Sequence, residues 1–149
     1  MIYDSMKATG RLSIVVKDKN GAVKETREVE NLVVTSGLEY IASRMANADN
    51  GVMSHMALGS GTTAAAAGDT ALGSELGRVA FTSATVSGAQ LVYVGAFDPG
   101  TATGAVTEAG IFNAATAGGM LCRTVFDVVN KAADDSLTIT WTVTIQAQS

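Results

Sequence analysis

The alternation of apolar and polar residues is most regular in the last long segment of the chain, Ser136–Ala147. Apolar side chains alternate there with threonines: Leu137, Ile139, Trp141, Val143 and Ile145 against Thr138, Thr140, Thr142 and Thr144. Successive side chains of a β-strand point to opposite faces, so this period of two predicts a strand with one buried face. We therefore expect Trp141 in the core, and the threonine row either in water or against a neighbouring subunit.

A β-hairpin is predicted near the start of the chain. Gly10–Lys17 is rich in β-branched residues, and Ala22–Glu30 follows with looser alternation. The linking Asp18-Lys19-Asn20-Gly21 contains an Asn-Gly pair, which tolerates the positive φ of a tight hairpin turn. Similar patterns separated by turn residues predict further strands at Val52–Leu58, Arg78–Val86, Gln90–Phe97, Val106–Phe112 and Met120–Val129.

One helix is predicted, from about Ser36 to Ala46. Ser36 and Glu39 fit the S-x-x-E capping box, in which each side chain accepts a hydrogen bond from a backbone N–H of the first turn. An apolar stripe at helical spacing follows, made of Leu38, Ile41, Ala42 and Met45. A helix of about three turns is marginal alone, so we expect this one to pack on the sheet.

Together these elements predict a mainly β fold of about eight strands with one short helix near residues 36–46. Many short strands separated by turns favour a β-sandwich or jelly-roll-like arrangement. The length of 149 residues fits one β-rich domain, residues 1–149. Gly59–Gly77 is the longest weakly patterned segment, and we expect a surface loop there, of a kind that often contacts a neighbour.

Composition and charge narrow the class of protein. Hydrophobic residues make up 47% of the chain and charged residues 16%, which excludes disorder by composition. The net charge of -4 argues against a nucleic-acid partner, which requires clustered Lys and Arg. No stretch approaches the roughly 20 apolar residues of a membrane span. Met1–Gly10 lacks the apolar run of a secretion signal, so we expect synthesis in a reducing cytoplasm.

The residue types that carry chemistry are sparse. Cys122 is the single cysteine, which excludes an internal disulfide, and we expect it to be a small buried hydrophobe. His55 is the single histidine, and we interpret it as structural or surface-exposed because no partner motif accompanies it. Asp18–Gly21 resembles the start of a calcium loop, but its glycine comes too early. Gly59–Thr63 lacks the lysine of a phosphate loop, and Asp134-Asp135 is expected to be a solvated turn.

The remaining carboxylates that could form an acid and base pair are scattered: Glu75, Asp98, Glu108 and Asp127. We therefore predict a protein that is not an enzyme, with no catalytic, cofactor-binding or metal-binding residues and no cofactor.

Blocks distributed over most of the chain resemble a group of small structural proteins of tailed-bacteriophage virions. These blocks are NLVVTSGLEYIASRM at 31–45, MALGSGTTAAAAGDTAL at 56–72, ELGR at 75–78, TEAGIF at 107–112, RTVF at 123–126 and LTITWTVTI at 137–145. In that group similar blocks appear in the same order, both in head decoration or cement proteins and in tail or fibre-associated proteins.

The resemblance implies a non-enzymatic protein of the virion, made in the host cytoplasm, that forms oligomers, commonly trimers. Its partners would be the major capsid protein or other virion proteins, with no nucleic acid and no membrane. The chain shows no repetitive shaft or receptor-binding tip, which favours a capsid decoration or cement protein over a tail, baseplate or fibre-attachment subunit. A carbohydrate-binding β-sandwich is a more distant alternative, because Tyr40, Tyr93 and Trp141 are few and scattered. Exposed strand edges and a low-charge surface also favour a homo-oligomer.

Overall fold

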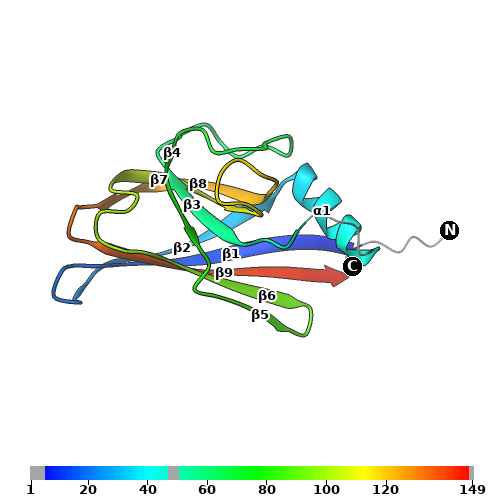
Figure 1. Cartoon of the computed structure of the whole chain (residues 1–149), viewed down its shortest axis with the longest axis horizontal. Helices are drawn as coiled ribbons and strands as arrows, with labels where there is room; N and C mark the ends of the chain where they lie inside the picture. The colour runs from blue at the N-terminus through cyan, green and yellow to red at the C-terminus, as the bar shows by residue number, and fades with distance from the viewer. Residues whose placement is uncertain (1–5, 47–50, 148–149) are drawn as a thin grey trace.

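The alternating segments form one antiparallel sheet. In the computed structural model, which describes residues 6–46 and 51–147, nine strands follow the order β4-β3-β7-β8-β2-β1-β9-β6-β5 (Figure 1). The elements are β1 (Met6–Lys17), β2 (Val23–Val33), α1 (Thr35–Met45), β3 (His55–Gly59), β4 (Glu75–Ala80), β5 (Ser83–Ser87), β6 (Gln90–Phe97), β7 (Gly104–Phe112), β8 (Met120–Lys131) and β9 (Ser136–Ala147).

The sheet curls until its two ends face each other across one apolar core. Met56 on β3 packs against β6, since a Cβ placed on Gly95 would lie 2.7 Å from the Met56 Sδ. Trp141, Phe97 and Leu12 are fully buried between the two halves. The mainly β fold with one short helix is confirmed. A single curled sheet does not by itself establish the sandwich or jelly-roll arrangement.

The hairpin and the last strand are confirmed. β1 pairs with β2 from Gly10 to Lys17 and with β9 along its whole length, which places Leu12 opposite Trp141. The side chain of Asp18 closes the hairpin turn by accepting hydrogen bonds from the backbone N–H groups of Asn20 (2.8 Å) and Ala22 (3.0 Å). The apolar row of β9 is buried except for Ile145 at its end, which is half-buried.

The prediction of one strand over Arg78–Val86 is wrong. The chain forms two strands there, β4 and β5, and they are the two opposite edges of the sheet. The Phe81 N–H donates to the Ser54 carbonyl, before β3, whereas the N–H of Thr82 donates to the Val94 carbonyl on β6. Adjacent residues thus bond to opposite ends of the sheet, because the curl brings those ends together. The strand predicted at Val52–Leu58 is also shorter, since β3 begins at His55.

The helix is confirmed at Thr35–Met45, but its capping box is wrong. Val34 is the N-cap and makes no side-chain cap, and the Ser36 hydroxyl donates instead to the Met120 carbonyl on β8 (2.9 Å). Gly37 is the buried residue of the helix. It lies so close to β8 that a Cβ at this position would overlap the Leu121 carbonyl. The helix therefore packs through its small residue against a strand backbone.

Most of the predicted apolar stripe of the helix faces outward. Ile41 packs on the core, together with Tyr40, which lies outside the stripe. Leu38 is 49% exposed and Met45 is 75% exposed. The helix thus leaves large apolar side chains at the end of the molecule where the described chain begins and ends, on β1 and β9 (Figure 1).

Candidate interaction face

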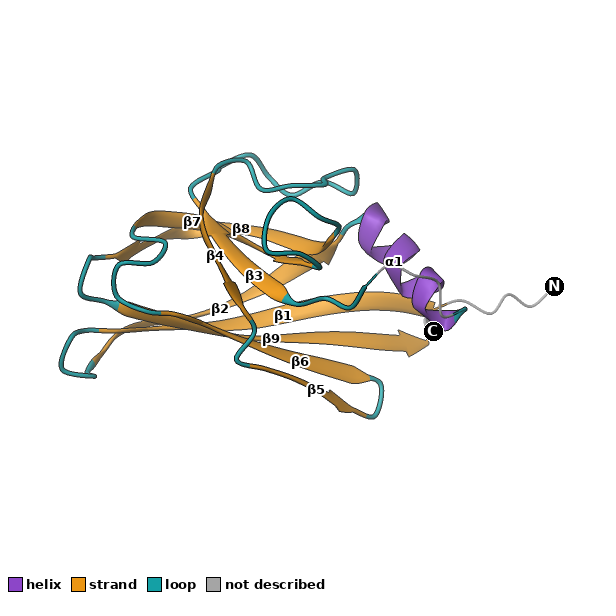
Figure 2. Cartoon of the chain, in the orientation of Figure 1, coloured by secondary structure: helices purple, strands orange, loops and turns teal. Residues whose placement is uncertain are grey.

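The outer side of the sheet differs between its two halves. The loops of residues 60–74 and 113–119, together with the start of α1, lie over β3, β7 and β8. Figure 2 shows no helix or loop beneath β9, β6 and β5 among the residues described. We call the outer side of β3, β7 and β8 the covered face, and the outer side of β1, β9, β6 and β5 the bare face.

Glu108 fixes the first loop of the covered face. This β7 side chain is fully buried, and its carboxylate accepts hydrogen bonds from the backbone N–H groups of Gly61 (2.6 Å), Gly73 (2.8 Å) and Ser74 (2.8 Å). A Cβ on Gly61 would overlap this carboxylate, so only glycine allows the loop to approach so closely. The hydroxyl of Thr107 adds a hydrogen bond to the Gly61 carbonyl (2.7 Å).

Arg123 on β8 completes this buried network. Its guanidinium donates to Glu108 Oε1 (3.0 and 3.1 Å), to Asp69 Oδ2 (2.8 Å) and to the Thr63 carbonyl (3.0 Å). Burial alone would raise the pKa of Glu108, but the three backbone donors and Arg123 outweigh it and hold that pKa below its usual value. The pKa of Asp69 is also lowered, by the backbone N–H of Ala66 and by Arg123. Both carboxylates are therefore charged at neutral pH.

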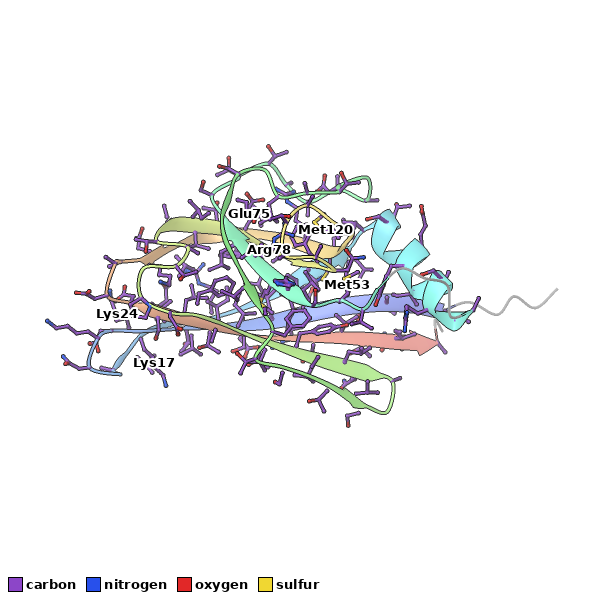
Figure 3. All side chains as sticks on the ribbon, in the orientation of Figure 1. Lys17, Lys24, Met53, Glu75, Arg78 and Met120 are labelled. Carbon is purple, nitrogen blue, oxygen red and sulfur yellow. The ribbon has the colours of Figure 1, made fainter. Side chains whose placement is uncertain are left out.

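Arg78 fixes the second loop. Its guanidinium lies 3.8 Å from the centre of the Phe112 ring and donates to the carbonyls of Ala114 (2.9 Å) and Ala117 (2.8 Å). Glu75 on the same strand accepts from Arg78 (2.7 Å), and the two side chains lie close together in Figure 3. Beneath both loops a small apolar cluster excludes water, formed by Val34, Ala57, Leu72, Phe112 and Met120.

The bare face presents small and β-branched side chains. The register places its side chains in rows across four strands, for example Ser13, Thr140, Val94 and Ser83. The members of the face are Lys7, Thr9, Arg11, Ser13, Val15 and Lys17 on β1, Ser136, Thr138, Thr140, Thr142, Thr144 and Gln146 on β9, Gln90, Val92, Val94 and Ala96 on β6, and Ser83, Thr85 and Ser87 on β5.

Charge is confined to one margin of the bare face. Its charged members, Lys7, Arg11 and Lys17, all lie on β1. Arg11 donates to Glu28 on the adjoining strand β2 (Nε to Oε2, 3.0 Å). Both side chains are largely exposed, at 70% and 58%, so this ion pair adds little stability. From β9 to β5 the face carries no charge, and its hydroxyl and methyl groups are half-buried or exposed. A face of this kind can pack closely against another protein without desolvating ions.

The other candidate residues are dispersed. His55 begins β3, half-buried, and its Nδ1 lies 2.7 Å from the Ser54 hydroxyl. Cys122 is fully buried, as predicted, and burial raises the pKa of its thiol. The expectation of a solvated turn is wrong for Asp135, which is buried and accepts from Lys24 (2.7 Å) and from the Ala132 N–H (2.9 Å).

Within residues 6–46 and 51–147, no group of three or more His, Cys, Asp or Glu side chains is arranged to hold a metal ion. The described part of the chain also contains no helix long and apolar enough to cross a membrane.

The Glu108–Arg123 pair was not predicted from the sequence. Each residue is a lone charge inside an apolar strand segment, and this is the signal that could have identified it. A charge that a strand carries into the interior needs a partner of opposite sign.

Comparison of the chain with family models gives no match, and no curated protein or solved structure matches it significantly.

Proposed function

We propose that this chain is a non-enzymatic structural protein of a tailed-bacteriophage virion, which binds the head surface and stabilises it as a decoration or cement protein. The bare face is the observation that carries this proposal. It spans four strands, and apart from Lys7, Arg11 and Lys17 on its marginal strand β1 it offers uncharged side chains on a regular β surface. The cores of protein interfaces are depleted in charge, so this face suits contact with a capsid subunit.

The locked loops of the covered face also support a structural role. The segment of residues 62–67 is made of small residues, Thr62, Thr63, Ala64, Ala65, Ala66 and Ala67. Glu108 holds it through the backbone N–H groups of Gly61 and Gly73 on either side, and Arg123 donates to the Thr63 carbonyl within it. A loop ordered before binding loses less conformational entropy when it meets a partner, and small residues allow a close approach.

A homo-oligomer, with a trimer as the form that the resemblance implies, belongs to the same proposal. The edge strand β5 is exposed along its whole length, and no charged residue occurs between Arg78 and Asp98. Uncharged strand edges pair readily with another chain unless something covers them. Light scattering at micromolar concentration tests this part, and a monomeric mass would contradict it.

Copy number tests the decoration role. In purified particles of the phage that encodes the chain, quantitative mass spectrometry should count hundreds of copies per particle. A handful of copies would contradict head decoration.

A tail, baseplate or fibre-attachment subunit is the second candidate, because the sequence blocks that support decoration occur in those proteins too. Electron microscopy of particles that carry a tagged copy separates the two sites. Label over the whole head supports decoration, whereas label confined to the tail supports the second candidate.

A carbohydrate-binding sandwich is less well supported. Trp141 is fully buried and Tyr93 is 6% exposed, so neither ring is available as a platform for a sugar. A glycan array with reproducible hits would revive this alternative.

The sandwich arrangement of the fold stays part of the proposal. The packing of β3 on β6 and the shared core support two facing layers, one of β4, β3, β7 and β8 and the other of β1, β9, β6 and β5. An experimental structure tests it through the angle between the strands of the two layers, since aligned sandwiches keep this angle near 30°.

A further inference from the structure

An apolar cavity opens at the end of the sheet next to α1. Its volume is about 560 Å³, and α1, residues 52–53 and the adjoining parts of β5, β6, β8 and β9 line it. Leu121, Tyr93 and Val143 are buried and form its floor. Met45 and Val52, which are 75% and 61% exposed, stand at its rim. The volume lies within the range of small-molecule pockets, about 300–1,000 Å³.

The lining of the cavity carries one charge. Among the described residues that line it, Arg44 on α1 is the single charged side chain. No ion pair joins Arg44 to a carboxylate of residues 6–46 or 51–147. Tyr40 and Tyr93 are the other polar lining residues, and burial raises the pKa of Tyr93 so far that its phenol stays neutral. The site therefore combines an apolar interior with one cation.

This combination defines the chemistry of a ligand. A hydrocarbon chain on the cavity floor would remove both its own surface and the apolar rim from water. A negative head group would meet Arg44, whereas a positive head group would be repelled and would find no carboxylate among the lining residues.

We propose that this cavity binds a fatty-acid-like ligand, a hydrocarbon chain that ends in a carboxylate. The chain lies against Leu121, Val143 and Ile145, and the carboxylate meets Arg44 at the mouth. This site is separate from the bare face, because its lining side chains on β6 and β9 belong to the opposite side of the sheet.

Binding of sodium dodecanoate to the full chain tests the proposal. Isothermal titration calorimetry at low ionic strength, below the concentration at which micelles form, should show one saturable site. Decanoate and octanoate should bind more weakly, by about fourfold for each buried methylene that is lost. Dodecyltrimethylammonium, which has the same chain with a positive head group, should bind at least tenfold more weakly than dodecanoate.

Methionine methyl groups locate the bound ligand. In carbon-13 methyl spectra, dodecanoate should shift the signals of Met45 and Met53, which line the cavity. The signal of Met120, which lies in the apolar cluster of the covered face, should stay unchanged. Met53 belongs to the main core, whereas Met120 belongs to the separate cluster of the covered face.

Two variants test the head-group and chain contacts. Arg44→Gln should weaken dodecanoate binding by about fivefold, the upper end for a solvent-exposed ion pair. Lys17→Gln removes the same charge at the opposite end of the molecule and should leave binding unchanged (Figure 3). Ala84→Trp, on the exposed strand β5, places an indole in the cavity and should reduce binding at least tenfold.

Three results would overturn the proposal: absence of saturable heat with dodecanoate, equal binding of the cationic chain, or methyl shifts at Met120 in place of Met45 and Met53. If Ala84→Trp does not fold, the methyl shifts and the comparison of Arg44→Gln with Lys17→Gln decide the question.

Discussion

The covered face and the bare face of the sheet handle charge in opposite ways. On the covered face, Glu108 and Arg123 are buried, and each meets partners from a loop that folds back over it. On the bare face, charge is limited to Lys7, Arg11 and Lys17 on the marginal strand β1, and threonine, serine and valine side chains remain open. The loops of the chain thus cover the half of the sheet in which Glu108 and Arg123 need hydrogen-bond partners. The half left open has few charges to desolvate when a partner arrives.

The main role of the buried Glu108–Arg123 ion pair is to position the loop of residues 60–74. Replacing a buried pair by apolar residues is often neutral for stability, whereas removing one partner leaves an uncompensated charge. Glu108 reaches three backbone N–H groups that no apolar side chain could satisfy. The carboxylate therefore specifies where the loop of residues 60–74 lies.

The first prediction tests the covered face by removing the carboxylate of Glu108. Glu108→Ala leaves the Arg123 guanidinium and three backbone donors buried without their acceptor, so the free energy of unfolding should fall by about 3–5 kcal/mol. Urea denaturation followed by circular dichroism measures it. Glu28→Ala, which breaks the exposed pair with Arg11, is the matched control and should cost less than about 1 kcal/mol. Equal losses of unfolding free energy in the two variants would show that the buried pair contributes no more to stability than the exposed pair.

The second prediction concerns Trp141, the core residue on β9 whose side chain points away from the bare face. Trp141→Ala should lower the free energy of unfolding by about 3–5 kcal/mol, because the side chain is fully buried on β9. Trp141→Phe is the matched variant. The indole Nε1 is buried with no hydrogen-bond partner among the described residues, so phenylalanine removes an unsatisfied donor as well as volume. It should cost clearly less than alanine, and a loss under 1 kcal/mol for Trp141→Ala would contradict the placement of this residue.

Acid should weaken the covered face. The folded-state pKa values of Glu108 and Asp69 lie below their usual values, so both groups stabilise the fold at pH above the unfolded values, about 4.3 and 3.9. That stability is lost as the pH falls from about 5 through the folded pKa values, because the unfolded chain binds protons first. Urea midpoints measured between pH 7 and pH 3 should show this decline.

Glu108→Gln provides the control for the acid effect. It cannot titrate at this position, so its stability should decline less steeply with acid than that of the original chain. Parallel declines in the two proteins would assign the acid sensitivity to other carboxylates.

The sequence predicts correctly those elements that neighbouring residues determine. The period of two in β9 and the turn at Asp18 are set by neighbouring residues, and both were found. The capping box failed because Ser36 has a stronger option, the Met120 carbonyl, which lies far away in the sequence. The break at Thr82 could not be predicted, because it depends on how far a nine-stranded sheet curls.

The sequence predicts only part of the bare face, namely the outward orientation of the β9 threonines. Alternation alone places the threonines of β9 on an outer face, but it does not distinguish a face in water from one against a neighbouring subunit. The loops that cover the other half depend on contacts such as Arg123 with Asp69, residues that are distant in the sequence. No periodicity encodes such a contact, so the contrast between the faces became visible only in the structure.

The smallest effect on stability, and the one that bears most directly on function, is expected at Thr140. Thr140→Ala removes an exposed hydroxyl and methyl from the bare face, so the free energy of unfolding should change by no more than about 0.5 kcal/mol. Thr140→Arg should also fold, since the side chain points to water, but it places a long charged group in the middle of the face. Binding to particles that lack the protein, measured by co-sedimentation, should be lost with arginine and kept with alanine. Lys19→Glu, at the exposed tip of the β1–β2 turn, is the control for a charge change elsewhere. If Thr140→Arg binds particles as well as the original chain does, the bare face is not the contact surface, and the locked loops of the covered face become the next candidate.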